Sequence, residues 1–264
     1  MSAAAYADDP EQGMRVAEDE PLVGNKPPLR RSNSSFVHLT QYNVRLGFIR
    51  KVLALVLMQV AFTAALSAVF MLVEPVKNYI QANIWVTLLA LCMWAACFTI
   101  IVFAACCQPC LSLLRHYPQN YVFLSIFTVV MAYFVAAVCT QYDSFSVLLA
   151  LTITVALVTA LTIYAVTTKT DFTMFTGILI CCIIGLLFFG LFAMIFQNRV
   201  VEIIYGSLGA IIFSIALVID IQMIVGGGKR HEYMEDDYVL AAMNIYLDII
   251  NLFLYILAIV GGKN

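Results

Sequence analysis

Two aspartates lie in stretches of this sequence that are otherwise suited to lipid. Asp220 falls in "SIALVIDIQMIV" and Asp248 in "NIYLDIINLFLYIL". An ionised aspartate at the centre of a membrane helix costs about 2.5–3.5 kcal/mol on insertion scales, so such residues usually face inward and serve a function. These two carboxyl groups are therefore the first candidates for chemistry.

If the two carboxyl groups lie close together in a low-dielectric site, they cannot both ionise easily, and they titrate as a unit that shares one proton. The charge of the site then changes with pH. The three histidines, His38, His116 and His231, lie outside the apolar segments, so a pH response arising within the membrane has to come from the aspartates. The alternative is that each aspartate hydrogen-bonds a neighbouring helix and only fixes packing.

The composition indicates a protein that crosses a membrane several times. Of the 264 residues only 11% are charged, against about 25% in soluble domains, and the mean hydropathy is +0.95. A span needs roughly 20 apolar residues. Seven windows qualify: Val52–Val73, Ile84–Cys107, Tyr121–Thr140, Phe145–Val166, Met174–Phe196, Ile203–Val225 and Val239–Val260. Each is too long for a strand and lacks strand alternation, so the sequence predicts an all-α membrane protein with a bundle of seven transmembrane helices.

The last two windows bring the two aspartates to a similar depth. The linker "GGGKRHEYMEDDY" joins the two windows into a hairpin. Asp220 lies five residues before the end of the sixth window, and Asp248 lies nine residues after the start of the seventh. We therefore expect a carboxyl pair. Asn244, Asp248, Asn251 and Tyr255 stand at i, i+4, i+7 and i+11, on one helical face. A helix with such a polar stripe needs protein or water on that side, which predicts a central position for the last helix.

Residues 1–44 differ from the rest of the chain, because they are rich in acidic residues and proline. They hold too few apolar side chains to offset the entropy of ordering, which predicts a disordered tail (1–44) before a transmembrane domain (45–264). With the N-terminus in the cytosol, all fourteen lysines and arginines except Lys77, Arg199 and Lys263 lie on the cytosolic side. This excess predicts that orientation. Seven spans then put the C-terminus on the other side, unless the last segment re-enters and returns it to the cytosol.

Three cysteines lie at the end of the second window, in "CCQPC" (106–110). Juxtamembrane cysteines are sites of palmitoylation, which makes Cys106, Cys107 and Cys110 candidates for lipidation. A zinc site needs further ligands, and only His116 is near, so we expect no metal there.

Four stretches, in order along the chain, resemble the transmembrane Bax-inhibitor-motif family. They are "YNVRLGFIRKVLALVLMQVAFTA" (42–64), "TIYAVTTKTDFT" (162–173), "VIDIQMIVGGGKRHEY" (218–233) and "DDYVLAAMNIYLDIINLFLYIL" (236–257). The first is similar to the lifeguard branch. The resemblance covers about residues 42–260. It implies a seven-helix bundle that leaks calcium across intracellular membranes in a pH-sensitive way and dampens cell-death signalling. The membrane implied is that of the endoplasmic reticulum or Golgi, with the plasma membrane as an alternative.

The family's di-aspartyl pH sensor falls on Asp220 and Asp248, each within its motif. Bacterial members can latch this pair to an arginine in the second helix, but the second helix here has no basic residue. Calcium prefers six to eight oxygen ligands, and Asp220, Asp248, Asn244 and Asn251 supply too few for tight capture. We therefore expect a weak, partly hydrated transit site, a path lined by Asn244, Asn251 and Tyr255, and no cofactor besides calcium as the permeant ion.

Three other functions fit a pair of membrane aspartates. An intramembrane aspartyl protease needs "GxGD" around its second aspartate and a "PAL" turn after it; here "IYL" precedes Asp248 and no proline follows Pro118, so we expect no enzyme. A proton-coupled calcium antiporter would use the same pair. A non-conducting scaffold would bind Bcl-2-type or death-receptor regulators through the acidic tail and "HEYMEDDY" (231–238). The sequence has no nucleotide-binding loop, no nucleophile–base pair and no nucleic-acid patch.

Overall fold

The structure is a computed structural model. It describes residues 30–106, 116–196, 198–226 and 230–261 of the 264. The chain separates into two units, Met1–Tyr42 and Asn43–Asn264. Residues 30–42 of the first unit form the beginning of a helix, and the helical bundle belongs to the second unit.

The described residues form helices joined by short turns, and they contain no β-strand. The elements are α1 (Arg30–Leu72), α2 (Glu74–Ala82), α3 (Ile84–Cys106), α5 (Gln119–Cys139), α6 (Ser144–Thr167), η1 (Phe172–Phe175), α7 (Thr176–Phe196), α8 (Arg199–Val225), η2 (Glu235–Asp237) and α9 (Tyr238–Val260). The predicted all-helical class is confirmed.

Six helices of the described chain are long and apolar enough to cross a membrane. They are Asn43–Leu72, Gln119–Cys139, Ser144–Thr167, Phe172–Ala193, Arg199–Val225 and Glu235–Val260. In addition, α2 and residues Trp85–Ala96 of α3 qualify together as a pair bent by 84°, which gives seven spans if the pair counts as one. The chain is thus a multi-pass membrane protein. The predicted count of seven and the central position of the last helix stay predictions.

α1 begins at Arg30, inside the segment predicted to be a disordered tail. The structure describes residues 30–44 as helix, and the predicted division into a tail (1–44) and a transmembrane domain (45–264) stays a prediction. Between Pro28 and Gly47 the chain has neither proline nor glycine, so no residue in this segment breaks a helix. Residues 1–29 of the predicted tail lie outside the described residues.

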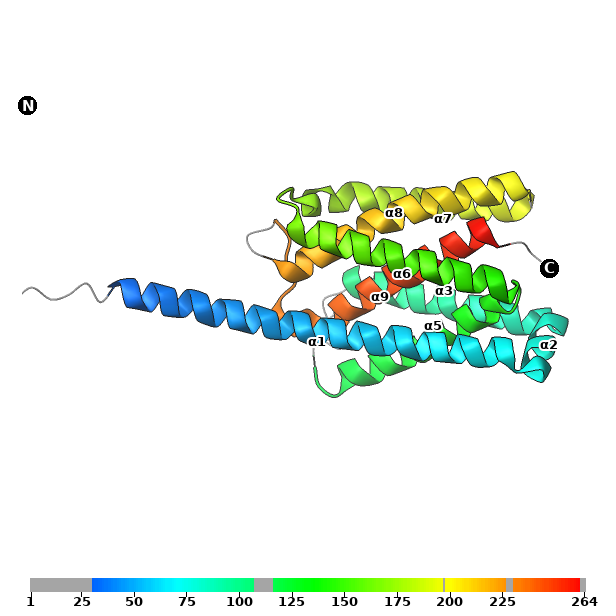
Figure 1. Ribbon diagram of the computed structural model, residues 1–264, viewed down its shortest axis with the longest axis horizontal. Coiled ribbons are helices and arrows are strands. Elements are labelled where there is room, and N and C mark those ends of the chain that lie inside the picture. The colour runs from blue at the N-terminus through cyan, green and yellow to red at the C-terminus, as the bar shows by residue number, and fades with distance from the viewer. Residues whose placement is uncertain (1–29, 107–115, 197, 227–229, 262–264) are drawn as a thin grey trace, which may run out of the picture. The chain divides into compact units, whose positions relative to one another are not determined.

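α8 and α9 make the most extensive helix contact in the bundle. Two glycines of α8 allow the close approach: a Cβ atom on Gly206 would lie 2.9 Å from Cγ1 of Ile259, and one on Gly209 would lie 2.5 Å from the ring of Tyr255. Around this pair, α6 packs against both helices, α5 against α9, and α7 against α8 (Figure 1). The packing of the other spans therefore holds the two aspartate-bearing helices together.

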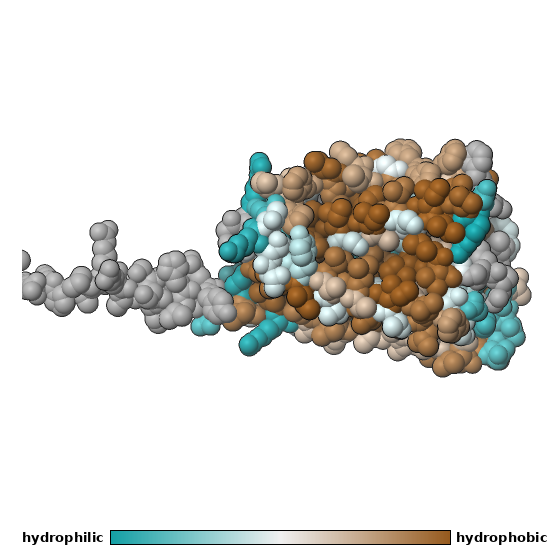
Figure 2. Space-filling model, turned by 45° about the horizontal axis from the view of Figure 1, so that its top comes forward, coloured by the Kyte–Doolittle hydropathy of each residue, from teal (hydrophilic) through white to brown (hydrophobic). Residues whose placement is uncertain are grey.

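The surface of the bundle is apolar in its middle. Figure 2 shows hydrophobic side chains across the centre of one face and hydrophilic residues at both ends. Leu57 of α1 and Leu148 of α6, for example, are 69% and 63% exposed. Exposed apolar surface of this extent needs hydrocarbon around it, not water, which makes the lipid bilayer the partner of this surface.

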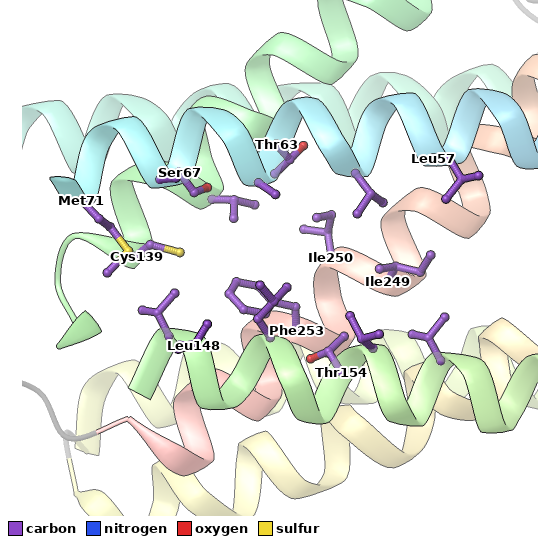
Figure 3. A pocket seen from close by; sticks show the side chains of 18 of the residues that line it. Leu57, Thr63, Ser67, Met71, Cys139, Leu148, Thr154, Ile249, Ile250 and Phe253 are labelled. Carbon is purple, nitrogen blue, oxygen red and sulfur yellow. The ribbon is translucent and has the colours of Figure 1, made fainter. Parts of the chain in front are cut away.

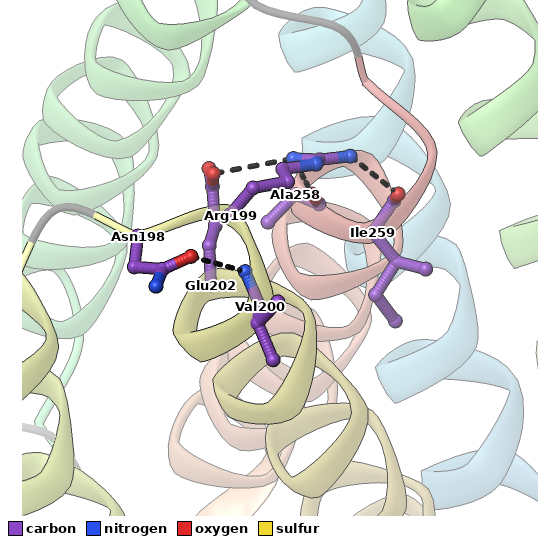
Figure 4. Close-up of polar contacts among 6 residues, drawn as sticks. All are labelled: Asn198, Arg199, Val200, Glu202, Ala258 and Ile259. Carbon is purple, nitrogen blue, oxygen red and sulfur yellow. Dashed lines mark hydrogen bonds and ion pairs between the residues drawn. The ribbon is translucent and has the colours of Figure 1, made fainter.

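At the end of the bundle away from the α8–α9 hairpin, Arg199 joins the start of α8 to the end of α9. Its guanidinium donates to the carbonyl oxygens of Ala258 and Ile259 over 2.9 and 2.8 Å, and it lies 3.2 Å from the carboxylate of Glu202 (Figure 4). Carbonyls in the last turn of a helix have no partner within that helix, and a cation beside them also complements the helix dipole. Arg199 therefore caps α9 from outside.

Replacing Arg199 by glutamine is expected to lower the free energy of unfolding by about 1–2 kcal/mol, because two charge-assisted hydrogen bonds to backbone carbonyls are lost. The change is measured by thermal denaturation of the purified protein in detergent. Arg230→Gln is the matched control: this arginine at the opposite end is exposed, and its backbone N–H, which the substitution keeps, donates to Asp171. The control is expected to stay within about 0.5 kcal/mol of the native chain. Equal effects of the two substitutions would contradict the capping role.

Candidate functional site

The antiparallel packing of α8 and α9 places Asp220 and Asp248 against each other. The two carboxyl groups form a side-chain hydrogen bond. Asp248 is buried, with 6% of its surface exposed, and Asp220 is half-buried. An ionised carboxylate can only accept hydrogen bonds, so one of the two groups must carry a proton for this bond to form. A pair that shares one proton therefore stays the prediction for this site.

The pair is incompletely satisfied. The Oδ2 atom of Asp248 is buried and has no hydrogen-bond partner. The sequence supplies no cation nearby along the chain, since α9 contains no lysine, arginine or histidine and α8 has only Arg199 at its far end. A buried polar atom without a partner costs roughly 1–3 kcal/mol. Gln59 and Ser67 of α1 also have a buried side-chain oxygen without a partner, so what distinguishes Asp248 is the hydrogen bond to a second carboxyl group.

Tyr233, from the loop between α8 and α9, adds a hydrogen bond to Asp220 of the pair. Its hydroxyl accepts a hydrogen bond from Nδ2 of Asn244 over 2.7 Å and is hydrogen-bonded to Asp220. Burial, and next the negative charge of Asp220, raise the pKa of Tyr233 well above 10. The hydroxyl therefore stays protonated and able to donate to the carboxyl pair at every physiological pH.

The remaining residues of the predicted polar stripe lie in different surroundings. Asn251 is buried, and its Nδ2 donates to the carbonyl of Leu247 in its own helix over 2.8 Å. The hydroxyl of Tyr255 lies 3.2 Å from that of Tyr205, and its ring stacks on Phe213. Of the stripe, only Asn244 and Asp248 therefore join the carboxyl site. The path predicted to include Asn251 and Tyr255 stays a prediction.

A second loop closes the same end of the bundle. Gln222, two residues after Asp220 and 1% exposed, donates from Nε2 to the carbonyl of Thr170 and accepts from the N–H of Phe172, over 2.9 and 2.8 Å. In that loop Asp171 accepts the N–H of Thr173 over 3.0 Å and so caps η1. This network fixes the end of α8 that carries Asp220.

Sequence reasoning missed Gln222 and Tyr233 as parts of the site. Gln222 was detectable, because it is the nearest polar residue to Asp220 within an apolar window, although it carries no charge. Tyr233 was not detectable from local sequence. It lies in a polar hairpin, and only the fold brings its hydroxyl to α9.

A cavity of about 490 Å³ opens between α1, α5, α6 and α9, apart from the carboxyl pair (Figure 3). None of the side chains that line it is charged. The hydroxyls of Thr63 and Thr154, which face it, already donate to carbonyls of their own helices over 2.8 and 2.7 Å. A cavity with this lining does not replace the water around an ion, so we do not assign it to an ion path.

The structure describes the predicted metal ligands, but not the side chains of the predicted lipidation sites. Among the described residues no three histidine, cysteine, aspartate or glutamate side chains gather as metal ligands, so Asp220 and Asp248 offer a pair of carboxyl groups and not a closed site. Cys107 and Cys110 lie outside the described residues, and Cys106 ends α3 with its side chain outside them too. Palmitoylation of the three cysteines stays a prediction.

Residues 45–264 match the family described as "Inhibitor of apoptosis-promoting Bax1". The chain belongs to this family. The relatives it matches include human protein lifeguard 3, 33% identical over 227 residues that cover 84% of this chain and 70% of the relative. Mouse protein lifeguard 3 is 30% identical over 84% of this chain and 71% of its own length. Mouse protein lifeguard 4 is 31% identical over 87% of this chain and 91% of its own length.

These matches confirm the Bax-inhibitor-motif family and its lifeguard branch, which four stretches of sequence predicted. The family match extends over the carboxyl pair, Tyr233, five of the six spans in full and all but the first two residues of the first span. This Bax-inhibitor family member is therefore a multi-pass membrane protein of a group that regulates apoptosis.

Proposed function

We propose that this lifeguard-branch protein is a pH-sensitive calcium leak of intracellular membranes, which lowers the calcium load of an organelle and so suppresses apoptosis. One observation carries the proposal: a buried carboxyl group, Asp248, and a half-buried one, Asp220, share a hydrogen bond between neighbouring spans. The protein is not an enzyme in this proposal, and it needs no cofactor.

The shared proton supplies the pH sensitivity. With one proton between them, Asp220 and Asp248 carry a single negative charge, and a second proton removes it while loss of the first doubles it. Each step changes how strongly the site attracts a cation and whether the hydrogen bond between the carboxyl groups persists. The site thus couples the occupancy of one proton to the path of the ion.

The oxygen ligands at the carboxyl pair suit weak binding of a calcium ion that passes through, and not tight binding of a stored one. The two carboxyl groups, the amide of Asn244 and the hydroxyl of Tyr233 have six oxygens between them, and one of these carries the shared proton, which leaves fewer than the six to eight oxygens that calcium prefers. A passing calcium ion therefore keeps part of its water, and weak binding permits release. The N-terminus faces the cytosol in this proposal, and the organelle is the endoplasmic reticulum or the Golgi, with the plasma membrane as an alternative.

A proton-coupled calcium antiporter is the second candidate. It is favoured by the same shared proton, because proton and calcium would compete for the same oxygens. A scaffold for Bcl-2-type or death-receptor regulators would instead use the hairpin, where Glu235 and Asp236 are exposed, and would leave the carboxyl pair without a role.

Calcium efflux from liposomes that contain the purified chain tests the proposal across a pH series. A leak moves calcium at equal pH on both sides of the membrane, at a rate that depends on that pH. An antiporter moves calcium only when a proton gradient drives protons across the membrane in the opposite direction. Efflux no faster than from empty liposomes, with or without a gradient, would leave the scaffold as the function.

A further inference from the structure

Arg45, near the start of the first span, binds the hairpin that carries the carboxyl pair. Its Nη2 atom donates to the carbonyl oxygen of Met223 over 2.6 Å, and its Nη1 atom donates to the carbonyl oxygen of Tyr233 over 2.8 Å. Met223 belongs to the last turn of α8 and Tyr233 to the loop that follows. The planar fork of a guanidinium suits two acceptors at once, so a single side chain of α1 joins both segments.

Tyr233 is held through its backbone and through its side chain. Its N–H donates to the same Met223 carbonyl over 3.2 Å, so the backbone at this residue is bound on both sides. At the tip of the ring, the hydroxyl contacts Asn244 of α9 and Asp220 of α8. The ring therefore reaches from the loop to the carboxyl pair.

Along the helix axes, the Tyr233 ring lies between the carboxyl pair and the hairpin end of the bundle. Met223 is three residues beyond Asp220 on α8, and Asn244 is four residues before Asp248 on α9. At a rise of 1.5 Å per residue, these contacts lie about 4.5 and 6 Å closer to the hairpin than the carboxyl groups do. A hydrated cation that approaches from the hairpin end meets Tyr233 before it meets Asp248.

The turn after α8 shows how closely Arg45 is fitted to the hairpin. Gly226 has φ of +65°, and a Cβ atom there would lie 2.8 Å from Nη2 of Arg45 and 2.8 Å from the carboxylate of Glu232. Only glycine combines this left-handed conformation with such an approach. The turn, the guanidinium and the Glu232 carboxylate therefore meet at one point, and the hairpin cannot move outward while Arg45 stays bound.

We infer that Tyr233 is the gate on the hairpin side of the carboxyl pair and that Arg45 is the positioning residue that holds it closed. The inference rests on the proposed function in one respect, that the carboxyl pair lies on an ion path. Opening requires the guanidinium to leave the carbonyls of Met223 and Tyr233. The loop is then released from α1, and the Tyr233 ring withdraws from between the pair and the hairpin end.

Two measurements on the full chain in liposomes test the gate. The first is calcium efflux, and the second is modification of Asp220 and Asp248 by a water-soluble carbodiimide, read by mass spectrometry of their peptides. Tyr233→Ala and Arg45→Gln are expected to raise both by about tenfold, because each removes at least one charge-assisted hydrogen bond from the closed state. Arg50→Gln, which changes an exposed arginine of the same helix, is the control and is expected to stay within about threefold of the native chain.

The relation between the two residues is tested by combining the changes. Because Arg45 acts through Tyr233, the double variant is expected to show no more efflux or labelling than Tyr233→Ala alone. Arg45→Lys, a point charge that reaches one carbonyl at a time, is expected to give an intermediate effect. It keeps the test decisive if the alanine variant fails to fold by gel filtration.

The outcomes separate this inference from the proposed function. If carbodiimide labels the aspartates of the native chain as readily as those of the Tyr233→Ala variant, there is no gate at Tyr233, whatever the efflux. If labelling rises as expected but no variant moves calcium, the gate stands and the calcium leak fails. If the double variant adds the two single effects, Arg45 does not act through Tyr233 and its positioning role is overturned.

Discussion

Replacing Asp248 by asparagine is expected to abolish the pH response of calcium efflux. The step in which two carboxyl groups share and release one proton exists only while both groups are present, so the variant loses this step although Asp220 remains. Asparagine keeps the size of the side chain, and its amide can still hydrogen-bond Asp220, so the packing of α8 on α9 is retained. Efflux is measured from liposomes over a pH series, with the Asp220→Asn variant alongside and the same result expected.

The matched control for this prediction is Asp236→Asn, which removes an exposed carboxyl of the same hairpin and is expected to leave the pH response unchanged. The double variant Asp220→Asn/Asp248→Asn is expected to behave as either single variant does, because the two groups titrate as one unit. A pH response that persists in both single variants would remove the carboxyl pair from the mechanism.

Replacing Gly209 by valine is expected to be the most destabilising single change among the glycines of the spans. The Cβ of any residue there would lie 2.5 Å from the ring of Tyr255. That ring has no free direction, because it stacks on Phe213 at 5.6 Å and meets the edge of Tyr205 at 5.3 Å between centroids. Forcing extra methyl groups into such packing costs about 1–3 kcal/mol or more, and α8 and α9 have to separate.

Thermal denaturation in detergent measures this effect, and Gly185→Val is the control. Gly185 lies in α7, also in a span, but a Cβ atom there would have nothing within 4 Å. Both substitutions put the same β-branched residue into a membrane helix, so the difference between them isolates the α8–α9 contact. Equal melting temperatures for the two variants would show that α8 and α9 do not pack as closely as described.

The spans were predictable because the thickness of the membrane sets the length of an apolar segment that crosses it, whichever helices lie beside that segment. The windows predicted from sequence for the last two helices end at Val225 and Val260, where α8 and α9 end. The start of α8 was placed too late, at Ile203 instead of Arg199. The two charges in its first turn argued against a span, and the sequence could not show that Arg199 would bind carbonyls of α9.

Only those residues of the site whose type is unusual in a membrane span could be predicted from the sequence. Asp220 and Asp248 stand out because carboxyl groups are costly in lipid, whatever the fold. Arg45 and Tyr233 lie 188 positions apart, in segments where an arginine or a tyrosine is ordinary. Their roles arise from backbone carbonyls, which every residue has, so no pattern of residue types could reveal them.

α7 is attached to the bundle along a narrow line. Only 6% of the residues in its membrane window, part of Phe172–Ala193, are buried, and it packs on α8 and η1. Separating it from α8 would exchange little protein contact for lipid contact, so we expect this helix to be the least strongly packed of the six spans. A single-molecule pulling experiment that grips the segment between α6 and α7 should therefore peel α7 away at low force, while the hairpin of α8 and α9 stays in the bilayer until a much higher rupture force is reached.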